Sequence, residues 1–376
     1  MDFELDPHYR LIQDQARKLA RAVEGFAAEA DEMSEVHSGV LAELRRSGLC
    51  ALMVPEEFGG QAGRPDPLAI CLVREALMGT SSHADSLFAL QGIGSYAITL
   101  AGSAEQRATW LPRVGTAEVL AALAITEEAV GSDVKNIATT ATRTADALIV
   151  RGTKSFISNG GAAGFYLVLC REEGDYSMIL VPADTPGVSV TPTPEIIAPH
   201  VLGEIHFDNV RLPADARLGR PGQGMDLVLA TLGVFRVSVA GAAVGLAQAA
   251  LEEAVRHTRT RVQFGRPLVR LGPVAQLLAD SWTEIEMARL LTYRAASAAV
   301  RDSAAALPQS SMAKLAATEA ASRVVDRCVQ VMGRFGLVRN TKIEKFYRQA
   351  RPMRIYEGAS EVLRLGIASQ LTKEVP

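Results

Sequence analysis

Four short segments of the chain combine residue types that could bind or transform a small molecule. The first is AITEEAVGSD, at residues 124–133. Gly131 lies among small and hydroxyl residues, so main-chain N–H groups could approach a ligand, and Thr126 and Ser132 add side-chain donors. The alternative is an ordinary turn, because Thr, Ser and Gly are common turn residues.

The second segment, KSFISNGG at residues 154–161, has the pattern of a strand that ends in a turn. In such a strand Phe156 and Ser158 would lie on one face, because alternate residues do. An aromatic ring beside a hydroxyl can flank and hydrogen-bond a flat ring. The alternative is a core phenylalanine next to a surface serine.

The third segment, RVQFGRPL at residues 261–268, places Arg261 and Arg266 on either side of a Phe-Gly break. Guanidinium groups bind phosphates through paired hydrogen bonds, so the segment could hold a phosphorylated ligand. Solvated surface arginines are the alternative.

The fourth segment is RPMRIYEGASEVLRLGIA, at residues 351–368. Glu357 precedes Gly358 and lies between apolar residues and a new helical pattern. A carboxylate in a cramped apolar turn has a raised pKa, which suits a general base near neutral pH. The alternative is a solvent-facing acid at the start of a helix.

The elements expected to position these segments follow a helix–strand–helix order. Residues 1–118 are predicted to form a helical domain, residues 119–224 a β domain, and residues 225–376 a second helical domain. In the first domain, one helical face is indicated by apolar residues at steps of three and four, namely Ile12, Ala16, Leu19, Val23 and Phe26.

The middle region differs in composition, because seven of the 17 prolines fall between Pro182 and Pro221. Four apolar runs bounded by Gly, Asp and Pro predict strands, at residues 147–152, 165–170, 177–182 and 204–210. Segregated strands and helices predict an α+β protein rather than a doubly wound sheet. The absence of a GxGxxG motif between a strand and a helix argues against a Rossmann dinucleotide site.

The helical pattern returns with residues 225–251, an apolar stretch long enough to cross a bilayer. Arg236 falls near its middle, where a cation is costly in lipid, so a helix buried in a helical core is predicted instead. Long alanine-rich amphipathic runs follow at Thr292–Ala306 and Ser310–Met332.

The composition agrees with a large, mainly helical, soluble protein. The 376 residues are 48% apolar and 5% aromatic, and they include 58 alanines, which favour closely packed helices. The net charge of -3 gives no electrostatic footprint for nucleic acid. The four cysteines lack metal-ligand spacing, so buried thiols are expected. No apolar signal region is found in the first thirty residues, which predicts a cytoplasmic protein without membrane partners.

The order and spacing of the four segments resemble the acyl-CoA dehydrogenase family over essentially the whole chain, and VPEEFGG (54–60) and WLP (110–112) are also family-like. The resemblance implies an α+β, mainly α fold: an N-terminal helical domain, a middle β-barrel domain and a C-terminal four-helix bundle. It also implies a homotetramer, or a dimer, with FAD held between barrel and bundle.

The resemblance assigns cofactor residues position by position. Ile125 and Thr126 would lie along the flavin ring, with Phe156 and Ser158 beside it. Arg261 and Phe264 would hold the diphosphate and adenine side. The loop that receives the adenosine part from a neighbouring subunit would contain Gln330, Gly333 and Gly336.

The resemblance also implies a reaction. Glu357 matches the family's catalytic base, which removes the α-proton of an acyl thioester, while the β-hydrogen leaves as hydride to flavin N5 and a trans-2-enoyl product forms. The thioester oxygen is expected to bond the Glu357 N–H and a flavin ribityl hydroxyl. The substrate would also meet Ser132, Phe235, Arg236 and Gly358. Electron-transfer flavoprotein is the expected acceptor.

Some positions depart from the family pattern. Phe235 occupies the position at which some family members carry the base. Because a phenylalanine side chain cannot accept a proton, Glu357 is the one candidate for that role. Gly233 and Val234 replace an Asp-Gly pair, Ala359 a common Thr, and Phe156 a common Trp. These departures leave open whether the substrate is an acyl-CoA or an acyl-carrier-protein thioester of a biosynthetic pathway. A flavin monooxygenase or oxidase on the same fold, and a non-enzymatic helical interaction protein, are the alternatives.

Overall fold

A computed structural model describes residues 4–302 and 305–374. Its contacts divide the chain into two compact units, which we treat separately. The helical unit comprises Met1–Ala28, Pro67–Asp85 and Arg236–Pro376. The sheet unit comprises Glu29–Asp66 and Ser86–Phe235.

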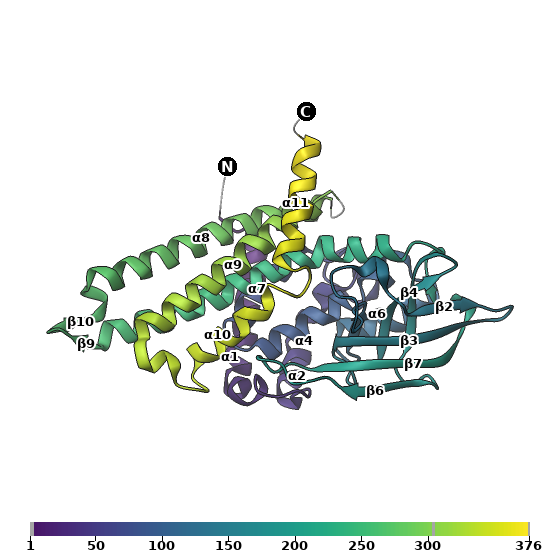
Figure 1. The fold of residues 1–376 in the computed structure, drawn as a ribbon, viewed down its shortest axis with the longest axis horizontal. Coiled ribbons are helices and arrows are strands. Elements are labelled where there is room, and N and C mark those ends of the chain that lie inside the picture. Colours follow the sequence, from purple (N-terminus) through teal and green to yellow (C-terminus); the bar gives the residue numbers. More distant parts are fainter. Residues whose placement is uncertain (1–3, 303–304, 375–376) are drawn as a thin grey trace. The chain divides into compact units, whose positions relative to one another are not determined.

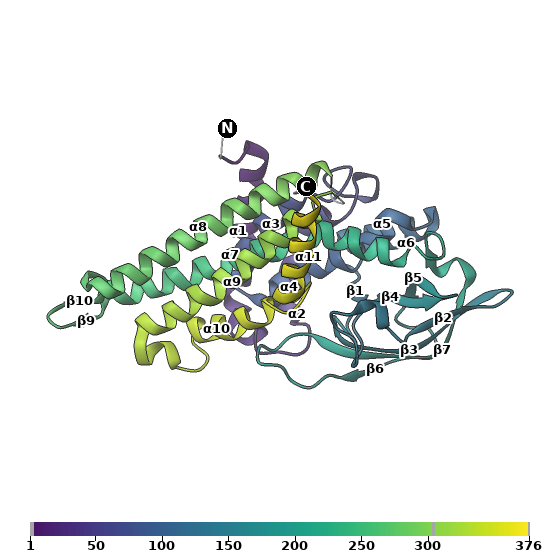
Figure 2. The same ribbon diagram turned by 45° about the horizontal axis from the view of Figure 1, so that its top comes forward.

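The helical unit is built around long helices that lie side by side (Figures 1 and 2). Helix α9 packs against α8 and α10. The bounds are α1 (Pro7–Ala30), α3 (Pro67–Met78), α7 (Gly224–Thr260, which begins in the sheet unit), α8 (Gly272–Arg301), α9 (Leu307–Met332), α10 (Lys342–Met353) and α11 (Ser360–Glu374). Short elements join them: strands β9 (Val262–Gln263) and β10 (Arg266–Pro267), and 3₁₀ helices η5 (Leu268–Arg270) and η6 (Gly333–Leu337).

The core of the helical unit consists mainly of alanine and valine from α7, α8 and α9. Small side chains let the helices approach closely, and the contact of α7 with α3 is the extreme case. A Cβ added at Gly245 would lie 1.9 Å from the Glu75 carbonyl oxygen, and one at Gly241 would lie 2.7 Å from that of Cys71. The abundant alanine therefore serves close helix packing, as the composition predicts.

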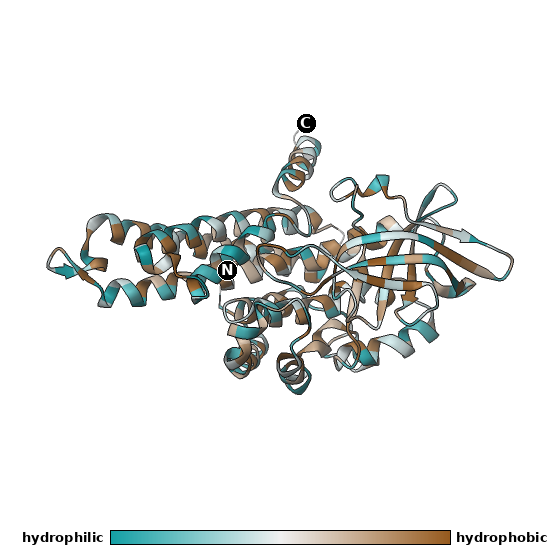
Figure 3. Ribbon diagram, turned by 60° about the horizontal axis from the view of Figure 1, so that its bottom comes forward, coloured by the Kyte–Doolittle hydropathy of each residue, from teal (hydrophilic) through white to brown (hydrophobic). Residues whose placement is uncertain are grey.

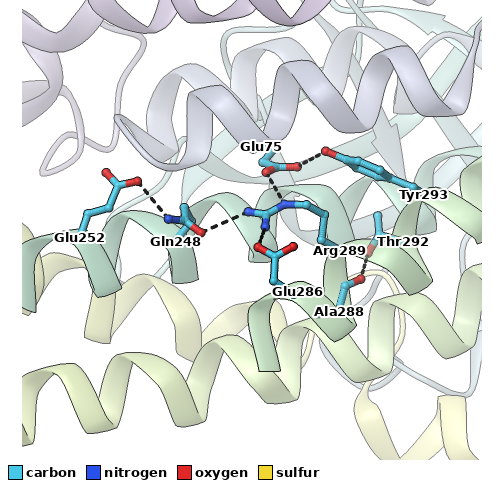
Figure 4. Close-up of polar contacts among 8 residues, drawn as sticks. All are labelled: Glu75, Gln248, Glu252, Glu286, Ala288, Arg289, Thr292 and Tyr293. Atoms are coloured by element: carbon cyan, nitrogen blue, oxygen red, sulfur yellow. Dashed lines mark hydrogen bonds and ion pairs between the residues drawn. The ribbon is translucent and has the colours of Figure 1, made fainter. Parts of the chain in front are cut away.

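A polar cluster links α3, α7 and α8 within this core (Figure 4). The Glu75 carboxylate accepts hydrogen bonds from Arg289 Nε at 3.0 Å and from the Tyr293 hydroxyl at 2.8 Å. Arg289 also donates to Gln248 Oε1 on α7 at 3.3 Å and pairs with Glu286. The Glu75 and Arg289 side chains are mostly removed from water, and such charges are costly unless paired, so the cluster favours the observed alignment of the three helices.

The sheet unit combines one eight-stranded sheet with short helices. The strand order is β6-β7-β3-β2-β4-β5-β8, and β1 pairs with β4. The strands are β1 (Ala121–Ala124), β2 (Thr140–Arg143), β3 (Ala147–Ser158), β4 (Phe165–Glu172), β5 (Asp175–Pro182), β6 (Val188–Pro192), β7 (Leu202–Pro213) and β8 (Arg217–Leu218). The helices are α2 (Ser38–Ser47), α4 (Ser82–Ile93, which begins in the helical unit), α5 (Tyr96–Ala101) and α6 (Ala104–Gly115), with 3₁₀ turns η1 (Leu49–Met53), η2 (Glu56–Phe58), η3 (Val134–Asn136) and η4 (Ala214–Ala216).

Both faces of the central strand β4 are buried, because residues of opposite parity belong to two different cores. Tyr166 and Val168 face a core enclosed by the sheet itself. Phe165 and Leu167 face a second core shared with α5 and α6, where the Trp110 ring lies 4.7 Å from the Phe165 ring. Figure 3 shows this concentration of apolar residues on the strands, against the alternation of polar and apolar residues along the helices.

The observed elements match the predicted sequence patterns closely. All four predicted strand runs are strands, and the helical face of α1 buries Ile12, Ala16, Leu19 and Val23. Helix α7 satisfies the length and hydropathy criteria for a membrane span, but 78% of its most apolar window is buried inside the protein. It is therefore a core helix, as Arg236 predicts. All four cysteines are buried free thiols.

One predicted boundary differs. The run Thr292–Ala306 was expected to be a single helix, but α8 ends at Arg301 and Asp302 is its C-cap. Residues 303 and 304 of that run lie outside the described residues. A new helix, α9, then begins at Leu307 with proline in its first turn, where the missing N–H of proline costs nothing.

Candidate active site

The Glu357–Gly358 turn joins α10 to α11 in an unusual main-chain conformation. Glu357 has φ +52° and Gly358 has φ +111°. A positive φ is uncommon for a residue with a side chain and marks a position that the surrounding structure must hold in place. The Glu357 side chain is partly buried, and its Oε2 atom is buried without a hydrogen-bond partner among the described residues.

Two cations from neighbouring helices hold the carbonyl groups of this turn. Arg236 Nε on α7 donates to the Glu357 carbonyl oxygen at 2.9 Å. Lys314 Nζ on α9 donates to the Gly358 carbonyl oxygen at 2.8 Å, and the Lys314 side chain is fully buried. Arg236 is itself oriented by a 3.0 Å hydrogen bond from Nη1 to Ser311 Oγ. The turn is thus fixed by charge-assisted hydrogen bonds from two sides.

Burial raises the pKa of the Glu357 carboxyl, because the charged form loses hydration. The positive charges of Arg74, Arg236 and Lys314 oppose that rise without cancelling it. Arg74 lies in a buried bidentate ion pair with Asp85, at 2.9 and 2.7 Å. A carboxyl group whose pKa is raised, and whose free oxygen has no partner, has the properties of a general base near neutral pH.

In the sheet unit, the first and second predicted segments lie together. The buried Lys154 Nζ donates to the Ile125 carbonyl oxygen and to Glu127 Oε1, both at 2.9 Å. The main-chain N–H of Ser155 donates to the Thr126 carbonyl oxygen at 2.9 Å. Residues 125–127 are therefore bound to the end of β3 by one buried side chain and one main-chain bond.

Glu127 and Lys154 form the ion pair behind this contact. Burial would raise the Glu127 pKa, but hydrogen bonds from Thr139, Ala138 and Lys154 outweigh that effect and lower it. Burial lowers the pKa of Lys154, an effect that Glu127 opposes. The pair is satisfied internally, so its role here is to position the main chain of the segment.

Phe156 and Ser158 lie at a bulge near the end of β3. The register of β3 against β7 shifts between Lys154 and Ile157, and Phe156 has φ +54° with 48% of its surface exposed. The bulge interrupts the regular alternation assumed from the sequence. An exposed aromatic ring held in a strained conformation is a candidate ligand contact, because such strain concentrates at functional sites.

Ser158 has a partner that the sequence did not indicate. Its hydroxyl lies 2.9 Å from His200 Nε2, and the same nitrogen lies 3.3 Å from Ser86 Oγ. Burial lowers the pKa of His200 to about 4, so this imidazole is neutral at physiological pH. His200 therefore orients the Ser158 hydroxyl without adding a charge.

The other two predicted residues of the sheet unit have contrasting surroundings. The Phe235 ring is fully buried and packs edge-on against Tyr96, with ring centroids 5.7 Å apart. It also fills the space over Gly92, where an added Cβ would lie 2.3 Å from the Phe235 ring. Ser132 is exposed on a loop.

The third segment forms a hairpin at the far end of α7. Strands β9 and β10 pair antiparallel, and the two residues between them, Phe264 and Gly265, have φ +50° and +74°. Phe264 is therefore presented at the tip, 89% exposed. The guanidinium of Arg261 lies 5.6 Å from the centre of the Phe335 ring, which brings the hairpin next to the loop that contains Gly333 and Gly336.

That loop has structural requirements of its own. Gly333 ends α9 with φ +59°, and a Cβ at Gly336 would lie 2.6 Å from the Val329 carbonyl oxygen. Gln330 is exposed on the last turn of α9. Arg261 is exposed and has no carboxylate within ion-pair distance in the part of the chain that the structure describes, so its guanidinium could bind an anionic group such as a diphosphate.

The sequence indicated the segments but not the groups that hold them. These groups act through contacts with residues elsewhere in the chain, and they are Lys314, Lys154, Glu127, His200 and the Arg74–Asp85 pair. The available signal for Lys314 was a lone cation in an alanine-rich run, which does not reveal burial. Among the described residues no cluster of His, Cys, Asp and Glu could hold a metal ion.

The chain matches family models along almost its entire length. These describe the acyl-CoA dehydrogenase N-terminal domain at residues 6–118, the middle domain at 122–210 and the C-terminal domain at 222–372. The chain belongs to the acyl-CoA dehydrogenase family. It is therefore an oxidoreductase with the helical N-terminal, β middle and helical C-terminal domains of that family, and acyl-CoA is the substrate typical of it.

Individual relatives agree with this assignment. Cyclohexane-1-carbonyl-CoA dehydrogenase of Geobacter metallireducens is 33% identical over 99% of both chains. Butyryl-CoA dehydrogenase from Megasphaera elsdenii superimposes with a TM-score of 0.94 at 28% identity, over 99% of this chain and 100% of that one. FkbI, from biosynthesis of the methoxymalonyl extender unit of the polyketide Fk520, gives 0.86 at 32% identity, over 96% and 100%.

The cofactor follows from relatives whose structures contain it. An acyl-CoA dehydrogenase from Bacillus anthracis complexed with FAD superimposes with a TM-score of 0.90 at 26% identity, covering 99% of this chain and 68% of that one. FAD is the cofactor of this protein. The Arg261 guanidinium, which has no ion-pair partner among the described residues, and the exposed, strained Phe156 ring fit a diphosphate and a flat heterocycle respectively.

Proposed function

We propose that the protein removes two hydrogens from the α and β carbons of an acyl thioester and forms the trans-2-enoyl thioester, with Glu357 as the base. The observation that carries the proposal is the Glu357 turn. It presents a buried carboxylate oxygen without a hydrogen-bond partner among the described residues, on a main chain held by Arg236 and Lys314.

The residues of the chain perform the proton step and the positioning. The Glu357 carboxylate takes the α-proton as the α C–H bond breaks, and its raised pKa makes it a strong enough base near neutral pH. The Glu357 N–H is proposed to bond the thioester oxygen, where negative charge develops. Arg236 and Gly358 shape the turn on the substrate side, and Ser132 and Phe235 are the proposed substrate contacts of the sheet unit. FAD, when bound, accepts the β-hydrogen as hydride.

The proposed cofactor contacts belong to both units. In the sheet unit they are Ile125, Thr126, Phe156 and Ser158. In the helical unit they are Arg261, Phe264, Gln330, Gly333 and Gly336. In the sheet unit, the proposal is supported by the hydrogen bonds that join residues 125–127 to β3. In the helical unit, it is supported by the contact of Arg261 with Phe335, which lies in the loop that contains Gly333 and Gly336.

Replacement of the base tests the proposal. Glu357→Gln keeps the shape of the side chain but removes its basicity, so the purified variant should stay yellow and no longer bleach with acyl thioesters under anaerobic conditions. Glu361→Gln is the matched control, because Glu361 is an exposed acid at the start of α11. Bleaching of Glu357→Gln at the wild-type rate would exclude Glu357 as the base.

The carrier and the acceptor are finer points of the proposal. An acyl-carrier-protein thioester is the second candidate substrate, because the similar FkbI serves biosynthesis of a polyketide extender unit. A panel of acyl-CoA and acyl-carrier-protein thioesters in the bleaching assay distinguishes the two.

We also propose electron-transfer flavoprotein as the acceptor and a homotetramer as the assembly, in the cytoplasm. Rapid oxygen consumption without an acceptor protein would instead indicate a monooxygenase or oxidase.

A further inference from the structure

The buried lysine on α9 is not explained by packing. Lys314 is fully buried, and burying an ammonium group is costly unless it is paired and hydrogen-bonded. Within the described residues, its ammonium group donates a hydrogen bond from Nζ to the Gly358 carbonyl oxygen at 2.8 Å. The hydrogen bond that offsets the cost of burying this ammonium group is therefore made by the main-chain carbonyl of Gly358, directly after Glu357.

The main chain at this position needs such support. Glu357 and Gly358 both have positive φ, and a conformation of this kind persists only where its surroundings hold it. Arg236 on α7 holds the carbonyl of Glu357, and Lys314 on α9 holds the next carbonyl along the chain. Two successive carbonyl groups are thus bound by cations from two different helices.

The charged groups that act on Lys314 most strongly come from the turn, from α7, from α9 itself and from the end of α10. Glu357 lies on the turn, Arg236 on α7, Glu319 on α9 itself, and Arg354 follows α10. Arg354 and Ser360 both donate to Glu319, at 3.0 and 2.7 Å. Glu319 is thus already paired, whereas Oε2 of Glu357 has no hydrogen-bond partner among the described residues.

We propose that Lys314 is a positioning residue for the catalytic base: its ammonium group fixes the Glu357–Gly358 turn and supplies positive charge that favours the ionised carboxylate. The inference rests on the proposed function of Glu357 and extends it to a buried residue that acts through the main chain of the turn. Burial lowers the pKa of Lys314 to about 8, which leaves it cationic at neutral pH and lets it lose its charge in mildly alkaline solution.

Three variants of the holoenzyme test the proposal. Lys314→Met removes the charge and the hydrogen bond, Lys314→Arg keeps a cation, and Lys345→Met is the matched control. Lys345 is also a buried lysine of the helical unit, but its Nζ donates to the Ala28 carbonyl oxygen at 2.6 Å, away from the base. Each variant is assayed for kcat and KM across pH 5–10 with one acyl-CoA that the wild-type enzyme oxidises.

We expect Lys314→Met to lower kcat by about tenfold or more, the effect of losing a charge-assisted hydrogen bond, with a smaller change in KM. The acid limb of its kcat–pH profile should move to higher pH, because the carboxylate loses a neighbouring positive charge. Lys314→Arg should keep the acid limb of the wild type. Lys345→Met should leave kcat and both limbs unchanged.

A Lys314→Met enzyme with kcat within about twofold of the wild type and an unmoved acid limb would overturn the proposal, as would the same changes in Lys345→Met. If Lys314→Met does not fold, Lys314→Arg decides, because guanidinium does not titrate below pH 10: an alkaline limb near pH 8 in the wild type must then disappear, and its persistence overturns the proposal. Failure of the wild type itself to oxidise any acyl thioester would count against the proposed function instead.

Discussion

Gly358→Ala is the most direct test of whether the conformation of the turn controls the base. Gly358 has φ +111°, a region that residues with a side chain rarely adopt, and such strain costs about 1–3 kcal/mol. The added Cβ would also lie 2.9 Å from Leu363 Cδ2 and 3.3 Å from Arg236 Nη2. Leu363 is buried, so it has little room to move aside.

The strain can be relieved by displacement of the turn, which carries Glu357 with it. A displacement of about 1 Å at a reacting group can lower a rate by about a hundredfold. We therefore expect kcat to fall by about ten- to a hundredfold, with a modest loss of thermal stability and no loss of FAD. The assay combines steady-state kinetics with thermal unfolding and the flavin absorbance of the purified variant.

Gly174→Ala provides the matched control. Gly174 also has a positive φ, +89°, but a Cβ there would meet no atom within 4 Å. Its cost is thus conformational strain alone, about 1–2 kcal/mol, in the turn between β4 and β5, which contains none of the proposed site residues. If Gly358→Ala retains kcat within about twofold of the wild type, the idea that this turn positions the base is wrong.

Two further predictions concern pH and stability. The pKa of Glu357 is raised in the folded state. The resulting contribution to the free energy of unfolding is fully present when the pH is below the ordinary pKa of glutamate, and it is lost as the pH rises through the raised pKa. Glu357→Gln should therefore gain thermal stability relative to the wild type as pH rises from 5 to 8, and a constant difference would contradict the burial argument. The opposite sign applies to His200, whose pKa falls to about 4, so its contribution is present above pH 6.5 and lost as pH falls toward 4. His200→Gln should therefore make the loss of stability between pH 6.5 and 4 less steep. The control is His206→Gln, which should not have this effect. It removes a partly exposed histidine of the same sheet, which is hydrogen-bonded to Thr153 and Thr191.

Local patterns in the sequence predicted most of the fold. Apolar residues at steps of three and four marked α1, and runs bounded by Gly, Asp and Pro marked strands β3, β4, β5 and β7. The arginine within the apolar stretch of α7 predicted a buried core helix rather than a membrane-spanning helix, and the burial of α7 agrees with this. These features could be recognised because hydrophobic periodicity is set over a few residues. The end of α8 was less visible, because alanine favours helix on both sides of Asp302.

The sequence also determined which residue types are available for chemistry, and its resemblance to the acyl-CoA dehydrogenase family points to Glu357 as the candidate base, because Phe235, at the alternative position, cannot accept a proton. Only the tertiary structure decided the environment of that carboxyl. Arg236 is 121 residues away from Glu357 along the chain, and Lys314 lies 44 residues before Gly358. Burial and hydrogen bonding between such distant residues arise only when the helices pack, and these interactions set the conformation and the pKa of the proposed base.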